Sequence, residues 1–400
     1  MKRHNSHIQF LPWRFRFVLL LFFLLIVALV VRMLYLTVLD RSFLLTQGAS
    51  RYLRTIKIPA YRGMIIDRYG HPLAVSTPVD SIWVNPEDYP ATFDNITNLS
   101  RTLRLSAMAI KKILRRHAKS QFVYLERNVN PDVANQIKSL AIPGVYLQQA
   151  YQRYYPQGEA AAQVIGFTNI DDQGQSGLEL AYHQWLSGKP GKERVLKDRY
   201  GQLVAILRDI SPAEPGHNLT LSLDQRLQYL AYTTLKETIL QHHAESGSVV
   251  ILNPRNGQIL AMVNVPSFNP NNRPSRDSGQ FRNRAVTDTF EPGSTMKAFS
   301  IASALDSGKY TAKSQIDTNP GYLNVGDNVI HDLEKNNGVL TVEQVLQKSS
   351  NIGVAKMTLS LPPEHFVDLL RRVGIGTRTN SGFPGEQSGS LVDHTSWRPF

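Results

Sequence analysis

The sequence predicts an α+β protein that is tied to a membrane by one N-terminal helix. Two observations lead to this prediction. The first is a long apolar run over residues 17–39. The second is the order of elements after residue 218, where a strand, a helix, a β-hairpin, a long loop and a further helix follow one another. That order fits an α+β or an α/β domain, and 400 residues are enough for two or three domains.

Composition narrows the classes of function. Apolar residues make up 42% and charged residues 19% of the chain, which excludes wholesale disorder. Cysteine is absent, and this excludes a disulfide framework, a cysteine nucleophile, cysteine-ligated zinc and iron–sulfur clusters. The net charge of +12 fits nucleic acid, an anionic membrane or an acidic polymer without choosing among them.

The apolar run is long enough to cross about 30 Å of hydrocarbon, with Arg32 near one end. The run exceeds the apolar part of a cleaved signal peptide and no A-x-A site follows it, so an uncleaved signal anchor is favoured. We therefore expect residues 1–16 in the cytoplasm, a single pass over 17–39 and the bulk of the chain in the periplasm, which weakens a nucleic-acid interpretation. Basic residues before the run support this orientation: Lys2, Arg3, Arg14 and Arg16.

The middle of the chain divides by composition. Residues 40–60 are predicted to be a stalk, 61–208 a mixed α/β domain and 209–217, rich in Pro and acidic residues, a linker. Residues 102–118 have helical apolar spacing and a basic opposite face. A solvated helix face accounts for this better than a surface for nucleic acid or for a membrane does.

The last predicted domain spans 218–400 and begins with regular elements. Residues 218–223 are expected to form a strand and 224–242 a helix with an aspartate N-cap. Two β runs, 246–252 and 258–264, are joined by a turn that ends in Asn-Gly, which indicates a hairpin.

Ser294 and Lys297 carry the first chemical signal. A Pro-Gly turn precedes them and an apolar, alanine-rich helix follows, so they are expected one helical turn apart on one face. A serine hydroxyl needs a base to become a nucleophile, and a lysine can serve once burial and the helix dipole lower its pKa. The helix N-terminus also offers N–H groups to an oxyanion. The alternative is a helix-capping serine beside an exposed lysine.

A second motif, Ser349-Ser350-Asn351, follows a predicted helix. Ser349 could relay the proton to a leaving group, and Asn351 could bind a substrate amide. The segment 267–269 also reads Ser-x-Asn. The position of 349–351 downstream of Ser294 and at a helix end favours it over 267–269.

Together these residues resemble class B penicillin-binding proteins, in particular the septal, cell-division type. The resemblance covers the chain from the anchor to about residue 384, and it rests on ordered blocks: RGMIIDR at 62–68, RYYP at 153–156, IGFTN at 165–169, PSFNPNN at 266–272, FEPGS at 290–294 and LQKSSN at 346–351.

The resemblance implies a bitopic inner-membrane protein with a non-catalytic pedestal at 61–208 and a serine transpeptidase domain at 218–400. Such a domain takes a peptidoglycan stem peptide ending in D-Ala-D-Ala, and β-lactams trap it. Ser294 would be the acylated nucleophile, Lys297 its base and Ser349 the proton relay, while Asn351 would contact substrate or Lys297. No metal or organic cofactor is implied. The implied partners are a SEDS glycosyltransferase and other divisome proteins.

One family motif is missing. The family carries Lys-[Ser/Thr]-Gly on a strand beside the cleft, and this sequence has none before Phe400. We therefore expect an incomplete transpeptidase domain in a truncated form. The alternative function is an inactive anchor and pedestal that binds division partners. A serine β-lactamase or sensor domain and an elongation-type penicillin-binding protein are the other enzyme-class alternatives.

Overall fold

A computed structural model gives the fold, and it describes residues 12–44, 46, 53–197, 203–273, 279–334 and 336–397. The chain forms two compact units, and neither is continuous in sequence. Unit 1 contains residues Met1–Arg62, Thr77–Gln152 and Ser187–Gly216, and unit 2 contains Gly63–Ser76, Arg153–Leu186 and His217–Phe400. Segments 63–76 and 153–186, both inside the predicted pedestal, thus cluster with the residues of the predicted transpeptidase domain.

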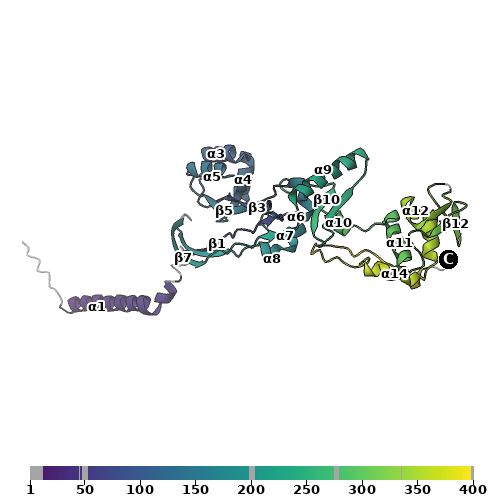
Figure 1. The fold of residues 1–400 in the computed structure, drawn as a ribbon. Helices are drawn as coiled ribbons and strands as arrows, with labels where there is room; N and C mark the ends of the chain where they lie inside the picture. Colours follow the sequence, from purple (N-terminus) through teal and green to yellow (C-terminus); the bar gives the residue numbers. More distant parts are fainter. Residues whose placement is uncertain are drawn as a thin grey trace, which may run out of the picture. The chain divides into compact units, whose positions relative to one another are not determined.

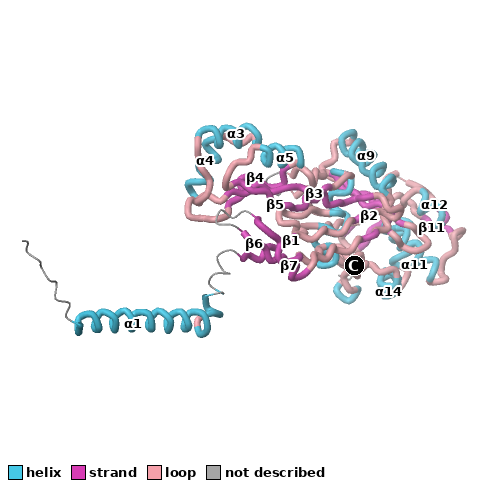
Figure 2. Tube along the Cα trace, turned by 90° about the vertical axis from the view of Figure 1, so that its left-hand side faces the viewer, coloured by secondary structure: helices cyan, strands magenta, loops and turns pink. Residues whose placement is uncertain are grey.

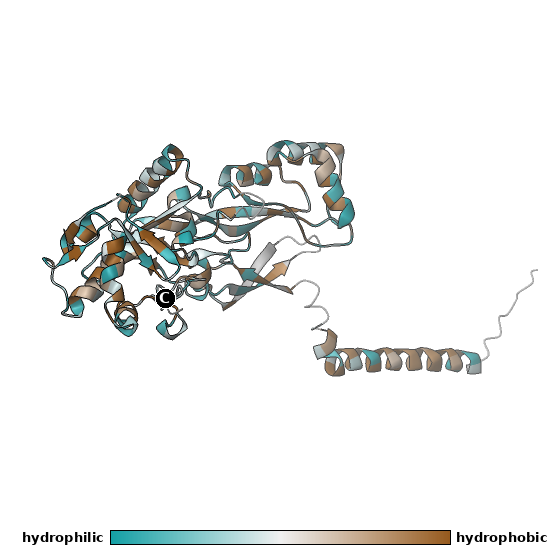
Figure 3. Ribbon diagram, turned by 90° about the vertical axis from the view of Figure 1, so that its right-hand side faces the viewer, coloured by the Kyte–Doolittle hydropathy of each residue, from teal (hydrophilic) through white to brown (hydrophobic). Residues whose placement is uncertain are grey.

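The N-terminal helix is α1 (Pro12–Leu34), which continues as one π-helical turn, η1 (Tyr35–Leu39). Together they give a span of 27 residues, Trp13–Leu39, that is long and apolar enough to cross a membrane. It is the one such helix in the described part of the chain. Its residues are mostly hydrophobic (Figure 3), and none of its most apolar stretch is buried. Arg32 lies near the end of the span, over the ring of Tyr35 at 5.3 Å. The predicted helix over 17–39 is confirmed.

Unit 1 contains a three-stranded antiparallel sheet in the order β1-β6-β7. Its first strand falls within the predicted stalk, so the second half of that stalk belongs to a folded sheet. Its last strand takes in the first three residues of the predicted linker, and Glu214 of the same linker forms a β-bridge with Lys189. The strands are β1 (Leu53–Ile58), β6 (Gly191–Lys197) and β7 (Leu203–Ser211).

A second part of unit 1 packs three helices on β-strands. Figure 2 shows α3, α4 and α5 over β4 and β5, and the core between them includes Ile82, Leu99 and Ile110. These elements are β3 (Pro72–Val84), α3 (Phe93–Leu103), α4 (Ala107–Arg116), β4 (Val123–Val129), α5 (Pro131–Ser139) and β5 (Val145–Tyr154).

The predicted helix over 102–118 is wrong at its start. Arg104 adopts a left-handed conformation with φ of 55° and ends α3. Ser106 then caps α4, because its Oγ accepts a hydrogen bond from the backbone N–H of Ala109 at 3.1 Å. The basic side chains of α4 are exposed, as a solvated face requires.

Unit 2 begins with β2 (Ile65–Ile66), which pairs with the start of β3 and runs parallel to β8 (Leu219–Thr220). The predicted strand over 218–223 is thus shorter than expected. Asp67 closes the turn after β2, where its carboxylate accepts the backbone N–H groups of Tyr69 and His71, both at 2.8 Å. Short helices follow: η2 (Gly158–Ala161), α6 (Ala162–Ile165), α7 (Gly177–Ala181) and α8 (His183–Leu186).

The predicted helix and hairpin after residue 224 are confirmed. α9 (Gln225–Gln241) is capped by Asp224, and β9 (Gly247–Leu252) pairs antiparallel with β10 (Ile259–Val265). Ala231 and Tyr232 of α9 pack against buried residues of β10. The hairpin is therefore covered by the helix that precedes it.

The rest of unit 2 forms a helical cluster with two small β-ribbons (Figure 1). α11 packs against α12, α13 and α14, with Ile301, Ala304, Val345 and Met357 among the buried residues. α10 (Arg284–Thr287) precedes this cluster and contacts β9 and β10. The elements of the cluster are η3 (Gly293–Met296), α11 (Lys297–Asp306), β11 (Gln315–Asp317), β12 (Tyr322–Val325), β13 (Asn328–His331), β14 (Val339–Thr341), α12 (Val342–Gln347), α13 (Asn351–Leu359), α14 (Pro363–Arg372) and η4 (His394–Ser396).

Candidate active site

Lys297 is the centre of the polar cluster that holds the predicted residues. It is the first residue of α11, and its Nζ donates to the carbonyl oxygen of Ser349 at 2.5 Å, to Ser349 Oγ at 2.9 Å and to Asn351 Oδ1 at 2.5 Å. Burial lowers the pKa of Lys297, while the negative charge of Asp332 opposes that shift. Three of the four predicted residues are therefore joined by direct hydrogen bonds.

Ser294 lies one turn before Lys297, in the 3₁₀ helix η3 rather than in the first turn of an α-helix. Gly293, with φ of 59°, makes the turn into this segment. Since a 3₁₀ helix has three residues per turn, positions 294 and 297 lie on the same side of it. The side chain of Ser294 is exposed, and among the described residues its hydroxyl makes no hydrogen bond. It is thus open to a molecule in solution.

Ser349 lies in a tight turn between α12 and α13. Its backbone N–H donates to the carbonyl of Leu346 at 3.1 Å, and that of Ser350 donates to Val345 at 3.0 Å. This pattern is a Schellman motif, in which the residue after the helix cap is left-handed and is most often glycine. Here it is Ser349, with φ of 52°. The turn directs both its carbonyl and its hydroxyl at Lys297.

Asn351 is the first residue of α13, and its amide is held at both ends. Its Oδ1 accepts from Lys297, and its Nδ2 donates to the backbone carbonyl of His331 at 2.7 Å. Because one atom must accept and the other must donate, these two contacts fix the orientation of the amide. Asn351 therefore acts on Lys297 in this arrangement.

Asp332 lies beneath the 349–351 turn, and sequence analysis did not predict it. One carboxylate oxygen accepts from Ser350 Oγ at 2.7 Å and from Asn337 Nδ2 at 2.9 Å, and the other accepts from the backbone N–H of Ile352 at 3.0 Å. Burial raises the pKa of Asp332, but these hydrogen bonds outweigh that effect and hold it below its ordinary value. The carboxylate is therefore charged at neutral pH.

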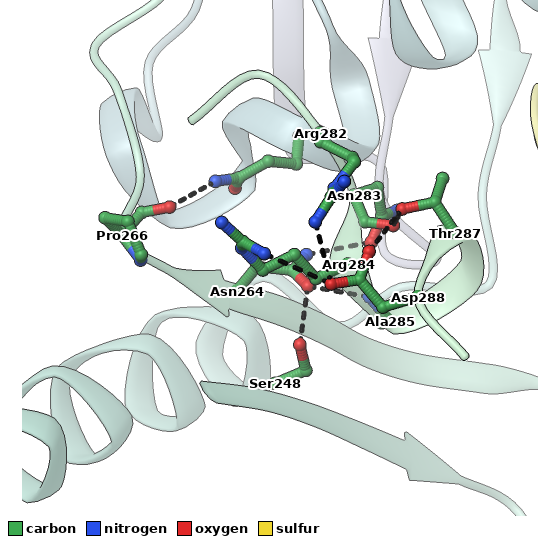
Figure 4. A network of polar contacts seen from close by, with 10 residues as sticks. Ser248, Asn264, Pro266, Arg282, Asn283, Arg284, Ala285, Thr287 and Asp288 are labelled. Atoms are coloured by element: carbon green, nitrogen blue, oxygen red, sulfur yellow. Dashed lines mark hydrogen bonds and ion pairs between the residues drawn. The ribbon is translucent and has the colours of Figure 1, made fainter. Parts of the chain in front are cut away.

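The segment before Ser294 is anchored to the hairpin by buried amides. Asn264 of β10 accepts from Ser248 Oγ at 2.8 Å, and its own Nδ2 donates to Asn283 Oδ1 at 2.8 Å (Figure 4). Asp288 follows in the same network, where it accepts from two neighbours at 3.0 and 3.1 Å, Arg282 and Arg284. These contacts fix the chain six residues before Ser294.

The second Ser-x-Asn sequence has a different role. The hydroxyl of Ser267 donates to the backbone carbonyl of Glu159 at 2.7 Å, and Asn269 accepts from the backbone N–H of Asn271 at 2.9 Å. Both side chains thus bind backbone groups, that of Ser267 on a distant segment and that of Asn269 within its own loop. Within the described residues, the structure brings 349–351 to Lys297 and leaves 267–269 elsewhere in unit 2.

Comparison with protein families and with individual relatives gives consistent results. Residues 247–398 match the penicillin-binding protein transpeptidase domain, and residues 57–221 match the penicillin-binding protein dimerisation domain. The chain is 44% identical over 385 residues to a probable peptidoglycan D,D-transpeptidase, PbpC, of Pseudomonas aeruginosa. The aligned region covers 96% of this chain and 68% of that relative. It is 40% identical over 403 residues to the peptidoglycan D,D-transpeptidase FtsI of Escherichia coli. Here the aligned region covers 99% of this chain and 68% of the relative.

Solved structures share the fold. Penicillin-binding protein 2X of Streptococcus thermophilus superposes with a TM-score of 0.67 at 23% identity and covers 86% of this chain and 55% of its own. A chain from a peptidoglycan synthase complex that coordinates polymerization and crosslinking superposes with a TM-score of 0.67 at 25% identity. The superposition covers 96% of this chain and 72% of the other. With two family domains and relatives at 40–44% identity over nearly all of its length, the chain belongs to the class B penicillin-binding proteins, the peptidoglycan D,D-transpeptidases.

Proposed function

We propose that this chain is a septal peptidoglycan D,D-transpeptidase that forms an acyl-enzyme on Ser294. The observation that carries the proposal is the bonding of Lys297 to Ser349 and Asn351, one 3₁₀ turn after an exposed serine. The identity to FtsI supports the septal role over the elongation-type role.

In the proposed reaction, Ser294 Oγ attacks the carbonyl carbon of the penultimate D-Ala of a stem peptide, and its proton passes to Lys297. A neutral amine has two N–H groups and one lone pair. Three oxygens accept hydrogen bonds from Lys297 Nζ: the carbonyl and the hydroxyl of Ser349 and the amide oxygen of Asn351. Of these, only the hydroxyl also carries a proton that it can donate to the lone pair. Ser349 therefore exchanges a proton with Lys297 and delivers it to the leaving D-Ala amine. An amine of a neighbouring strand then attacks the ester carbonyl, the bond from the acyl carbon to Ser294 Oγ breaks, and the proton that the amine loses returns to Ser294 Oγ. β-Lactams stop the reaction at the acyl-enzyme.

The proposal includes the setting of the enzyme. The helix at Trp13–Leu39 anchors the chain in the inner membrane, with the N-terminus in the cytoplasm and the remainder in the periplasm. A SEDS glycosyltransferase and other divisome proteins are the proposed partners. This is supported by the structural similarity to a chain of a peptidoglycan synthase complex.

The first test is covalent labelling of the membrane-embedded 400-residue protein with a fluorescent penicillin. We expect a labelled band that is absent in Ser294→Ala, since that variant has no hydroxyl to acylate. Lys297→Met should slow labelling by about 10²–10⁴-fold, the usual contribution of a general base. Lys309→Met is the matched control, because Lys309 also belongs to this unit but binds the carbonyl of Ser360, and it should label normally.

Labelling that persists in Ser294→Ala would overturn the assignment of the nucleophile. No labelling of a protein that resists protease would overturn the enzymatic proposal for this chain. That second result would instead support the alternative, an anchor and pedestal that bind division partners.

A further inference from the structure

We propose that Asp332 is a positioning residue of this active site: its carboxylate holds the 349–351 turn in the geometry in which Ser349 and Asn351 bind Lys297. The inference rests on the proposed function, because it assigns importance to Lys297 as the base. Asp332 does not contact Lys297 through a hydrogen bond, so its effect passes through the turn and through its charge.

The hydrogen bonds of Asp332 hold the turn on both sides of Asn351. It accepts from the hydroxyl of Ser350 and from the backbone N–H of Ile352. Only 9% of Asp332 is exposed, so water does not compete for these bonds. Bonds to a charged acceptor are about twice as strong as neutral ones. The negative charge also lies at the N-terminus of α13, where the helix dipole favours it.

The turn needs such a support. Ser349 has a left-handed backbone that a non-glycine residue adopts at a cost, and such conformations persist only where the surroundings over-determine them. Ser350 is fixed twice, since its Oγ donates to Asp332 and accepts from the backbone N–H of Gly353 at 2.9 Å. With Ser350 and Ile352 both held by Asp332, the carbonyl and the hydroxyl of Ser349 stay directed at Lys297.

Residues 331 and 332 both affect Lys297, the first through Asn351 and the second through its charge. The backbone carbonyl of His331 accepts from Asn351 Nδ2 at 2.7 Å, while the charge of Asp332 favours the ammonium form of Lys297 against burial. Glu334 and Lys348 are charged groups near this turn that pair with each other at 3.5 Å, and Lys348 Nζ also donates to Asn337 Oδ1 at 3.2 Å. The carboxylate therefore sets both where Lys297 is held and the pH at which it becomes a neutral base.

Asn337 makes a sharp test possible. Asp332→Asn keeps the size of the side chain, removes the charge and replaces one of the two acceptor oxygens by an amide donor. That donor then faces either Asn337 Nδ2 and Ser350 Oγ or the backbone N–H of Ile352, so part of the network is lost in either orientation. The double variant Asp332→Asn with Asn337→Asp restores a donor–acceptor pair and moves the carboxylate to position 337. Asp317→Asn is the control, because Asp317 is an exposed carboxylate of the same unit that accepts from Asn319.

Two measurements are made on the membrane-embedded chain. The first is hydrogen exchange of the backbone amides at 350–353, whose protection should fall about tenfold or more in Asp332→Asn, the loss expected for a charged hydrogen bond. The second is the rate of penicillin acylation against pH. In Asp332→Asn the rate should fall about tenfold at its plateau, and its rise should move to lower pH, because the lost negative charge no longer favours protonated Lys297. The double variant should recover exchange protection and most of the rate.

The proposal is overturned if exchange at 350–353 is unchanged in Asp332→Asn, or if the double variant is no better protected than the single one. If Asp332→Asn folds in poor yield, the yield and the exchange protection of the double variant decide. Their recovery supports the proposal, and their failure to recover overturns it. If the wild type is never acylated, the proposed function fails and hydrogen exchange still decides the role of Asp332. If the wild type is acylated and Asp332→Asn has an unchanged rate and pH profile, this inference fails alone.

Discussion

Ser349 combines an unfavourable backbone with two favourable contacts. A left-handed conformation is about 1–2 kcal/mol less favourable for a residue with a Cβ than a right-handed one, and glycine is the usual choice at this position of a Schellman motif. Yet the side chain and the carbonyl of Ser349 both accept from Lys297. The backbone of Ser349 is thus less favourable than that of a glycine would be, but its side chain places a hydroxyl beside Lys297 Nζ.

Replacing Ser349 with glycine should separate stability from activity. We expect Ser349→Gly to raise the free energy of unfolding by about 1 kcal/mol, since glycine adopts this conformation without penalty. It should also slow penicillin acylation by about 10²-fold or more, since the hydroxyl that we propose as the proton relay is lost. Thermal unfolding and the labelling rate measure the two effects. His243→Gly is the matched control, with φ of 51° just after α9. It should gain similar stability and label normally, and normal labelling of Ser349→Gly would contradict the proton-relay role.

Residue spacing in the sequence predicted that Ser294 and Lys297 lie close together, but not that Asp332 lies beneath the 349–351 turn. Ser294 and Lys297 are three positions apart in one helical segment, so their neighbourhood follows from local geometry. Ser349 and Asn351 were identified by their order in the chain and by resemblance. Asp332 is 18 residues before Ser350, and a single aspartate after a short strand carries no local pattern. Its contact with the turn exists only once β13 and α13 are packed together.

At the scale of elements, α12 and α13 meet where the second helix begins. Gly353 lies in the first turn of α13, against Val345 of α12, which is fully buried. A Cβ at position 353 would lie 2.6 Å from Val345 Cγ2 and 2.8 Å from its Cγ1. The absence of a side chain at 353 therefore sets how closely the two helices approach beside the Ser349 turn.

Gly353→Ala should be destabilising in spite of its gain in helix propensity. We expect a loss of about 1–3 kcal/mol in the free energy of unfolding, the usual effect of overpacking a filled core, and a parallel loss of penicillin labelling as α13 shifts. Adding Val345→Ala removes the two methyl groups that clash. In a double-mutant cycle the pair should therefore be more stable than the sum of the single effects. Additive effects, measured by denaturant unfolding, would show that the two positions do not interact.

Elements were predictable where local sequence determines them. The aspartate cap of α9 and the Asn-Gly turn of the β9–β10 hairpin are short-range signals, and both predictions hold. β1 lies in a polar segment and becomes a strand because it pairs with β6, far along the chain. The break between α3 and α4 depends on a left-handed Arg104, a conformation that its residue type does not indicate.

At the scale of the whole molecule, the lack of cysteine makes the proposed topology directly measurable. We expect Ser246→Cys, at an exposed position after α9, to react with a membrane-impermeant maleimide in intact spheroplasts. Ser6→Cys, in the N-terminal segment that is predicted to be cytoplasmic, should react only after lysis. The wild-type chain is the blank, since it has no thiol. The reverse pattern of labelling would refute the proposed orientation.

Unit 2 draws on three separate stretches of the chain, and this sets the order in which it can fold. The residues beside its first strand and those beside β8 are 154 positions apart, as the bond from Met64 to Asn218 shows. In the proposed topology the chain is exported from its N-terminal side, so β2 and the start of β3 emerge long before β8, the parallel partner of β2. Closure of so long a loop must precede the contacts that stabilise it, which slows folding and leaves strands exposed to aggregation. In this topology unit 2 therefore cannot complete its fold until the stretch from His217 onward has crossed the membrane, and periplasmic chaperones should be needed most while residues 77–216 are crossing.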